Sequence, residues 1–162
     1  MKKETTHFFE QLVETNKSKI YRICQIYAVS PVEPQDLFQE VIFQVWKSLP
    51  QFKQKSSIHT WVYRITLNVC LRSKLKFDND KTTRLEAVQI TSANPTEDDG
   101  NLKILRECIA TLDDTDTSII LLYLEEMAYK EISQITGLTE NHIAVKMKRI
   151  KRRLLECMQP KL

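Results

Sequence analysis

Glycine is almost missing from this sequence, and proline is scarce. The 162 residues include 2 glycines and 5 prolines. Few stretches alternate apolar and polar residues as half-buried strands do, whereas helical spacing of apolar residues recurs along the chain. The composition therefore favours an all-α fold.

Long apolar runs are also missing. No run of about 18 apolar residues occurs, so we expect no membrane span. The N-terminus, MKKETTHFFEQL, carries two lysines but lacks the apolar region of a signal peptide. The expected location is therefore the cytoplasm.

Sequence patterns typical of catalysis and of metal binding are also missing. The histidines fall in three separate elements, and neither a nucleophile–histidine motif nor a glycine-rich phosphate loop is present. The spacings between successive cysteines, 46, 38 and 49, fit no metal motif. We expect no enzyme activity, metal or cofactor, and we interpret the cysteines as small buried hydrophobes or free thiols of a reducing compartment. These residues are His7, His59, His142, Cys24, Cys70, Cys108 and Cys157.

Charge is present but unevenly placed. Residues 1–77 have 12 Lys+Arg and 6 Asp+Glu, residues 78–100 have 2 and 6, and residues 101–162 have 10 and 9. A basic block, an acidic polar stretch and a mixed block predict two domains, 1–77 and 101–162, joined by a linker over 78–100.

The basic block contains two helical patterns around a short polar loop. A helix predicted from Thr6 to Val29 comes first and ends at Ser30–Pro34, because proline cannot continue it. The next helix, from Asp36, has an apolar half and a polar half. Phe43 lies in the polar half, which suggests a partner-docking face; a lone exposed phenylalanine is the alternative. The apolar half is Leu37, Phe38, Val41, Ile42, Val45, Trp46 and Leu49.

The helix after the loop combines basic donors with aromatic side chains. It is predicted to begin with Ser57 or Thr60 as N-cap. Arg64, Asn68 and Arg72 recur every four residues beside an apolar stripe. Cations hold phosphates and flat rings stack on bases, so this surface suits a single nucleic-acid strand. The rings offered are Trp61, Tyr63 and His59, although Trp61 could equally be core.

The mixed block predicts a helix-turn-helix. Gly137 suits the turn, Thr139 suits an N-cap, and the second helix should bury Ile143, Met147, Ile150 and Leu154. The opposite face then carries donors and one small apolar group, as major-groove recognition requires. A solvated basic helix is the alternative. The face consists of Asn141, Val145, Lys148, Arg149 and Arg152.

These segments resemble two conserved regions of the bacterial sigma-70 family, in its short, two-domain extracytoplasmic-function (ECF) form. DLFQEVIFQVW followed by FKQKSSIHTWVYRITLN is similar to the second region, and the stretch from Leu105 to Leu154 is similar to the fourth. The resemblance implies two helical domains, the first docking on the clamp helices of core RNA polymerase and melting the −10 element, the second holding the −35 element of promoter DNA.

The resemblance also implies roles for individual residues. Polymerase binding falls to Asp36, Gln39, Glu40, Phe43 and Lys47. Binding of the −10 strand falls to Lys53, Lys55, Ser56, Ser57, His59, Trp61, Arg64, Asn68 and Arg72. Binding of the −35 duplex falls to Thr139, Asn141, Val145, Lys148, Arg149 and Arg152.

The chain departs from the family pattern at several of these positions. Gln54 and Lys55 stand where a Gly-Glu pair is common, His59 stands where arginine is common, and Ala144–Val145 replace polar residues. The resemblance therefore does not imply a particular promoter sequence, and it leaves open whether an anti-sigma factor is a further partner.

Two other classes of protein fit parts of the sequence. A helix-turn-helix regulator that does not bind polymerase would explain residues 137–150, but it predicts an N-terminal receiver with alternating strands, which residues 1–77 lack. A pure adaptor would not need two basic recognition surfaces.

Overall fold

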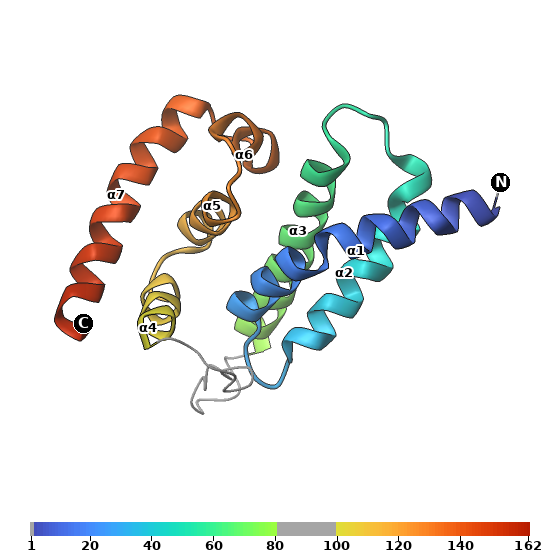
Figure 1. Ribbon diagram of the computed structural model, residues 1–162. Coiled ribbons are helices and arrows are strands. Elements are labelled where there is room, and N and C mark those ends of the chain that lie inside the picture. The colour runs from blue at the N-terminus through green and yellow to red at the C-terminus, as the bar shows by residue number, and fades with distance from the viewer. Residues whose placement is uncertain (1, 81–99) are drawn as a thin grey trace. The chain divides into compact units, whose positions relative to one another are not determined.

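The computed structural model describes residues 2–80 and 100–162, and its contacts divide the chain into two compact units (Figure 1). Every regular element in these two ranges is a helix, which confirms the all-α prediction. None of these helices is long and apolar enough to span a bilayer. Residues 81–99 of the predicted linker lie outside the described residues.

The N-terminal unit is built from three helices that pack side by side, each against the other two (Figure 1). They are α1 (Lys2–Tyr27), α2 (Pro34–Ser48) and α3 (Ile58–Asp80), with a 3-10 turn, η1 (Leu49–Gln51), after α2. Their shared core is mostly apolar and almost fully buried. Its most buried members are Ile20, Ile23, Cys24, Val41, Val45, Val62 and Cys70.

Helix ends differ from the sequence prediction by a few residues. α1 begins at Lys2 rather than Thr6 and ends at Tyr27 rather than Val29. Apolar periodicity cannot locate the start, since the first turn is polar and continues through a hydrogen bond from Thr6 Oγ1 to the Lys2 carbonyl (2.8 Å). α3 continues to Asp80, into the stretch predicted as linker.

The C-terminal unit surrounds one long helix. α4 (Gly100–Ile109), α5 (Asp114–Leu124) and α6 (Tyr129–Thr136) each pack against α7 (Glu140–Met158), which a 3-10 turn, η3 (Gln159–Lys161), follows. The four α7 residues predicted to be buried, spaced by four, three and four positions, all are buried. Gly137 ends α6 with φ of 78°, a left-handed conformation that glycine adopts at little cost.

The interpretation of the cysteines needs a correction. Cys24 and Cys70 are buried free thiols, as expected, but Cys108 and Cys157 form a disulfide between α4 and α7. The sequence could not show this, because helical periodicity gives the face of a helix on which a residue lies but not the helix that packs against it.

Candidate nucleic-acid interface

The polar face of α2 is turned toward solvent. Phe43 is 55% exposed, although Val41 and Val45 on the same helix are buried. The Asp36 carboxylate helps to cap the N-terminus of α2, because it accepts a hydrogen bond from the Glu33 backbone N–H (3.1 Å). The exposed residues of this face include all five predicted for polymerase binding: Asp36, Gln39, Glu40, Phe43 and Lys47.

Trp46 was predicted to lie in the apolar half of α2, but it is 44% exposed. Its ring contacts Phe9 of α1 edge-on, with centroids 4.9 Å apart. A tryptophan is large enough to cover a neighbouring helix and still show one edge to water, so a position near the margin of the apolar half stays partly open. Phe43 and Trp46 therefore give the outer side of α2 two exposed aromatic rings.

The loop before α3 presents cations around a supported aromatic pair. Lys53 and Lys55 are exposed, and the Phe52 ring packs against the Trp61 ring with centroids 5.2 Å apart. Gln54, between the lysines, has φ of 57°. This left-handed conformation is one that glycine adopts at lower cost than glutamine does.

The two loop serines differ in what their hydroxyls do. Ser57 Oγ accepts a hydrogen bond from the Thr60 backbone N–H (3.1 Å) and donates one to Thr60 Oγ1 (2.9 Å), so Ser57 caps α3. Ser56 Oγ donates only to the neighbouring Ser57 carbonyl, at 3.3 Å. Ser56 is therefore the serine whose hydroxyl can turn toward a ligand without uncapping the helix.

The next turns of α3 separate outward donors from an inward polar cluster. Arg64, Asn68 and Arg72 are all exposed, on one side of the helix. Tyr63, expected among the rings that stack on bases, is instead 3% exposed, so that expectation is wrong. Tyr63 directly follows Val62 of the apolar stripe in sequence. It lies on a side of α3 next to that stripe, where its ring fits into the core.

Asn16 of α1 is the centre of that cluster, and the sequence analysis missed it. Its Oδ1 accepts a hydrogen bond from Tyr63 Oη (3.3 Å) and lies 3.1 Å from His59 Nδ1, while its Nδ2 donates to the Leu12 carbonyl (2.8 Å). An asparagine four residues after Leu12 and four before Ile20 occupies a core position, which was the available signal. His59 remains exposed despite this contact, and the cluster fixes its ring against α1.

Helix α7, the second helix of the predicted helix-turn-helix, has its polar face turned outward. Thr139 Oγ1 accepts a hydrogen bond from the His142 backbone N–H (3.1 Å), which confirms the predicted N-cap. Val145, the one apolar member of the face, is 58% exposed. The other exposed members predicted to contact the −35 duplex are Thr139, Asn141, Lys148, Arg149 and Arg152.

A buried acid fixes the orientation of α7, and it too was missed. Asp116 in the first turn of α5 lies 3.2 Å from Lys146 Nζ and 3.8 Å from Arg153 Nη1. The Asp116 and Lys146 side chains are 10% and 17% exposed. Lys146 therefore neutralises a buried charge inside the unit, in contrast to the outward cations of the exposed face of α7.

Lys151 is held at the surface by an aromatic partner. Its Nζ donates to Tyr123 Oη (3.2 Å) and lies 4.6 Å from the ring centroid. This hydrogen bond raises the pKa of Lys151, so the side chain stays charged. Among the residues that the structure describes, no cluster of metal-ligating side chains is found.

Comparison with known proteins matches each of the two units to a protein family. Residues 12–78 match the family Sigma-70 region 2, and residues 102–154 match Sigma-70, region 4. The chain belongs to the sigma-70 family. More narrowly, it is a sigma factor of the extracytoplasmic-function type, as its full-length relatives indicate.

Two relatives from Bacillus subtilis (strain 168) match over nearly their whole lengths. The ECF RNA polymerase sigma factor SigW is 23% identical over 92% of this chain and 88% of its own length. The RNA polymerase sigma factor SigV is 25% identical over 91% of this chain and 90% of its own length.

Two solved structures share the fold. The sigma factor RpoE, solved with the anti-sigma factor NepR from Bartonella quintana, has a TM-score of 0.76 and 18% identity, covering 93% of this chain and 96% of that one. CnrH, solved with the cytosolic domain of CnrY, has a TM-score of 0.72 and 16% identity, covering 97% and 91%.

Proposed function

We propose that this sigma factor gives bacterial RNA polymerase its promoter specificity by dividing the work between its two units. Residues 1–77 dock on core polymerase and open the −10 element, residues 101–162 hold the −35 duplex, and residues 78–100 join them. The observation that carries the proposal is the presence of two separate outward donor surfaces, on α3 and α7, in one chain with an exposed aromatic on α2. The role is non-catalytic and is exercised in the cytoplasm.

The docking face is the polar side of α2. Phe43 supplies a large apolar side chain already free of the core, and the surrounding charges supply orientation. Interface hot spots are typically such aromatic side chains ringed by polar contacts that exclude water. The partner surface that we propose is the clamp helices of the largest polymerase subunit.

Capture of the −10 strand belongs to the loop before α3. Opening a duplex takes a base out of its stack at a cost of a few kcal/mol, which the protein must offset. Lys53 and Lys55 meet phosphates, and Ser56 offers a hydroxyl to a base edge. The Phe52–Trp61 pair, with centroids 5.2 Å apart, supports the inner side of the loop. The strand then follows Arg64, Asn68 and Arg72 along α3.

Recognition of the −35 element belongs to α7. Asn141 and Val145 lie near the start of the helix, where a recognition helix meets base edges, whereas Lys148, Arg149 and Arg152 lie further along and serve phosphates. Asp116 supports this arrangement because it anchors α7 from the opposite side through Lys146.

An anti-sigma factor is the further protein partner that we propose. The solved RpoE relative carries the anti-sigma factor NepR, which motivates this expectation. A protein recovered with this chain must compete with core polymerase in a titration to qualify. If the recovered protein left binding to core polymerase unchanged, it would not be the proposed anti-sigma factor.

Run-off transcription is the experiment that tests the proposed function. Core polymerase is mixed with the purified chain on a library of randomised promoters, and the templates that yield full transcripts are sequenced. A sigma factor enriches two motifs at a fixed separation. A regulator that binds DNA without core polymerase would enrich one motif in binding assays and give no sigma-dependent transcript.

A further inference from the structure

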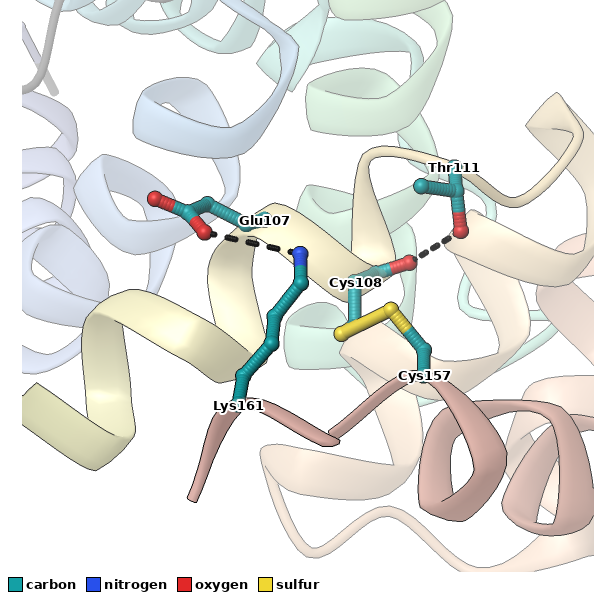
Figure 2. The surroundings of a disulfide bond; sticks show 5 residues. All are labelled: Glu107, Cys108, Thr111, Cys157 and Lys161. Atoms are coloured by element: carbon teal, nitrogen blue, oxygen red, sulfur yellow. Dashed lines mark hydrogen bonds and ion pairs between the residues drawn. A yellow bond between two sulfur atoms is a disulfide. The ribbon is translucent and has the colours of Figure 1, made fainter. Parts of the chain in front are cut away.

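The disulfide between Cys108 and Cys157 is the one covalent tie between helices in the described residues (Figure 2). It joins positions 49 residues apart in sequence, with Cα atoms 5.9 Å apart, inside the range that unstrained bridges occupy. The bond fastens the last turn of α4 to the last turn of α7. It therefore links the recognition helix to the helix that opens the C-terminal unit.

α4 depends on this attachment more than the other helices do. It has only 10 residues, and a helix of that length is marginal without tertiary contacts. Its first residues are exposed, with Leu102 at 49%, and only Cys108 and Ile109 are buried. Its main packing partner is α7. The bridge thus lies at the end of α4 that packs against the rest of the unit.

The ion pair that joins α4 to η3 beside the bridge is weak. Lys161 Nζ and Glu107 Oε2 are 3.8 Å apart at the surface, with side chains 46% and 44% exposed (Figure 2). Thr111 Oγ1, in the turn after α4, donates to the carbonyl of Cys108 in the last turn of α4 (2.6 Å), so this contact does not reach α7 (Figure 2). An exposed ion pair adds little to stability, so the disulfide is a stronger link at this junction than the ion pair is.

The two sulfur atoms differ in access. Cys108 is 0% exposed, whereas Cys157 is only partly buried. Thiol–disulfide exchange begins when a thiolate attacks one sulfur of the bridge. An external thiolate can approach only from the Cys157 side, which makes Cys108 the leaving group of the first step.

A second pair of cysteines provides an internal contrast. Cys24 of α1 and Cys70 of α3 are both fully buried. A hydrogen bond with Cys24, together with burial, raises the pKa of Cys70 well above its usual range, so this thiol stays protonated and unreactive. The described residues thus hold one disulfide with a partly exposed sulfur atom and one pair of buried free thiols.

From these observations we propose that Cys108–Cys157 is a redox-modification site, opened by a dithiol reductant at Cys157, and that its state decides whether α4 stays fastened to α7. In the first step the reductant's thiolate forms a mixed disulfide with Cys157 and releases Cys108 as a thiolate, which takes up a proton. The reductant's second thiolate then displaces Cys157, which also becomes a thiol. The protein gains two electrons and two protons, and the reductant becomes a disulfide. Most intracellular disulfides are transient or sensing, which suits a regulated site in a cytoplasmic factor.

The test uses the full-length chain, with dithiothreitol as the dithiol probe. Free thiols are alkylated before and after treatment and located by peptide mass spectrometry. Without reductant, Cys108 and Cys157 should resist alkylation in the folded and the denatured protein. After brief treatment both should become labelled, the partly exposed Cys157 faster than the buried Cys108 once both thiols are free, whereas Cys24 and Cys70 should become labelled only on denaturation in either condition.

Hydrogen exchange then measures the structural consequence. A bridge typically shifts an unfolding equilibrium by roughly 30- to 1,000-fold, so reduction should speed exchange of the α4 amides from Ile104 to Ile109 at least about tenfold. The Ile143 and Met147 amides of α7 serve as an internal reference and should change less. Cys157→Ser should match the reduced protein with or without the probe, and Cys24→Ala should keep the wild-type response.

Several results would overturn the proposal. Free labelling of Cys108 and Cys157 in the denatured, unreduced protein would show that the bridge does not form. Equal α4 exchange in the bridged and reduced forms would show that the bridge does not control the helix. Since none of these readouts involves DNA or polymerase, failure here would leave the proposed function standing, and failure of the proposed function would leave this site standing.

Discussion

Phe43 is a single side chain whose exposure allows docking to be tested apart from folding. Because it is 55% exposed, its removal should hardly affect stability. We expect Phe43→Ala to weaken binding to core polymerase by about 1–3 kcal/mol, the cost of truncating an aromatic that becomes buried at an interface. Fluorescence-anisotropy titration with core polymerase measures the change.

Leu155 is a matched control, since it is also 55% exposed but lies in the C-terminal unit. Leu155→Ala should bind core polymerase as the wild type does. If Phe43→Ala also bound with unchanged affinity, the assignment of this face of α2 would be withdrawn.

Asp116 is the residue whose loss should most damage the C-terminal unit. Asp116→Asn leaves Lys146 as a nearly buried charge without its partner, and breaking such a pair costs about 3 kcal/mol. Adding Lys146→Met should recover most of this stability, because no unpaired charge is then buried. Hydrogen exchange at Ile143 and Met147 reports the free energy of opening.

Glu131 provides the comparison for Asp116, because it is an exposed acid on α6. Glu131→Gln should change the stability by no more than about 0.5 kcal/mol. An Asp116→Asn variant as stable as wild type would mean that Lys146 reaches water once released, and the anchoring role of Asp116 would be lost.

At the scale of the element, the proposed opening of the −10 strand can be tested at the loop before α3. We expect Lys53→Ala combined with Ser56→Ala to reduce the open complex sharply on a double-stranded promoter, read by permanganate reactivity. Core binding and −35 affinity should stay near wild type. A promoter with a pre-melted bubble should restore much of the signal, because the cost of unstacking has already been met.

Ser57 has to be kept out of that variant, because it caps α3. Ser57→Ala alone should lower the stability of the N-terminal unit by about 1 kcal/mol. Normal opening by the double variant, or no recovery on the bubble promoter, would show that the loop is only a connector.

Helix α7 makes a different prediction for each end of its outward face. Arg152→Ala should weaken all duplexes alike and reduce the slope of log affinity against log salt by about one. Asn141→Ala should instead alter the preferred sequence while leaving the slope nearly unchanged. Binding to a set of −35 duplexes across a salt series separates the two effects.

Lys103 of α4 controls for net charge in this series, since it is exposed and lies outside the recognition face. Lys103→Ala should leave both sequence preference and salt slope close to wild type. A reversed pattern, with Asn141→Ala changing the slope and Arg152→Ala the preference, would mean that α7 meets the groove in another register.

At the scale of the whole molecule, the features that could be predicted from the sequence are those set by apolar periodicity and by the chemistry of neighbouring residues. The burial of Ile143 and Met147, the left-handed Gly137 and the Thr139 cap follow from rules acting within a few residues. The placement of Tyr63 was wrong because a helical wheel marks the middle of an apolar stripe better than its margin.

What the sequence could not give is which positions meet across helices. The Cys108–Cys157 bridge, the Asn16 contacts with α3 and the Asp116–Lys146 pair all join residues at least 30 positions apart. Each depends on how helices pack, which no local pattern encodes. The site residues assigned from the resemblance remain predictions for the variants above.

The two tryptophans of the chain, Trp46 and Trp61, both lie in the N-terminal unit. Trp46 lies on α2 beside the proposed docking face with 44% of its surface exposed, and Trp61 of α3 packs on Phe52 of the loop before α3. The wild-type protein therefore has a fluorescent tryptophan at each of the two proposed contacts of the N-terminal unit, whereas residues 101–162 contain no tryptophan. Emission should respond to core polymerase and to a −10 single strand, but a −35 duplex alone should leave it unchanged.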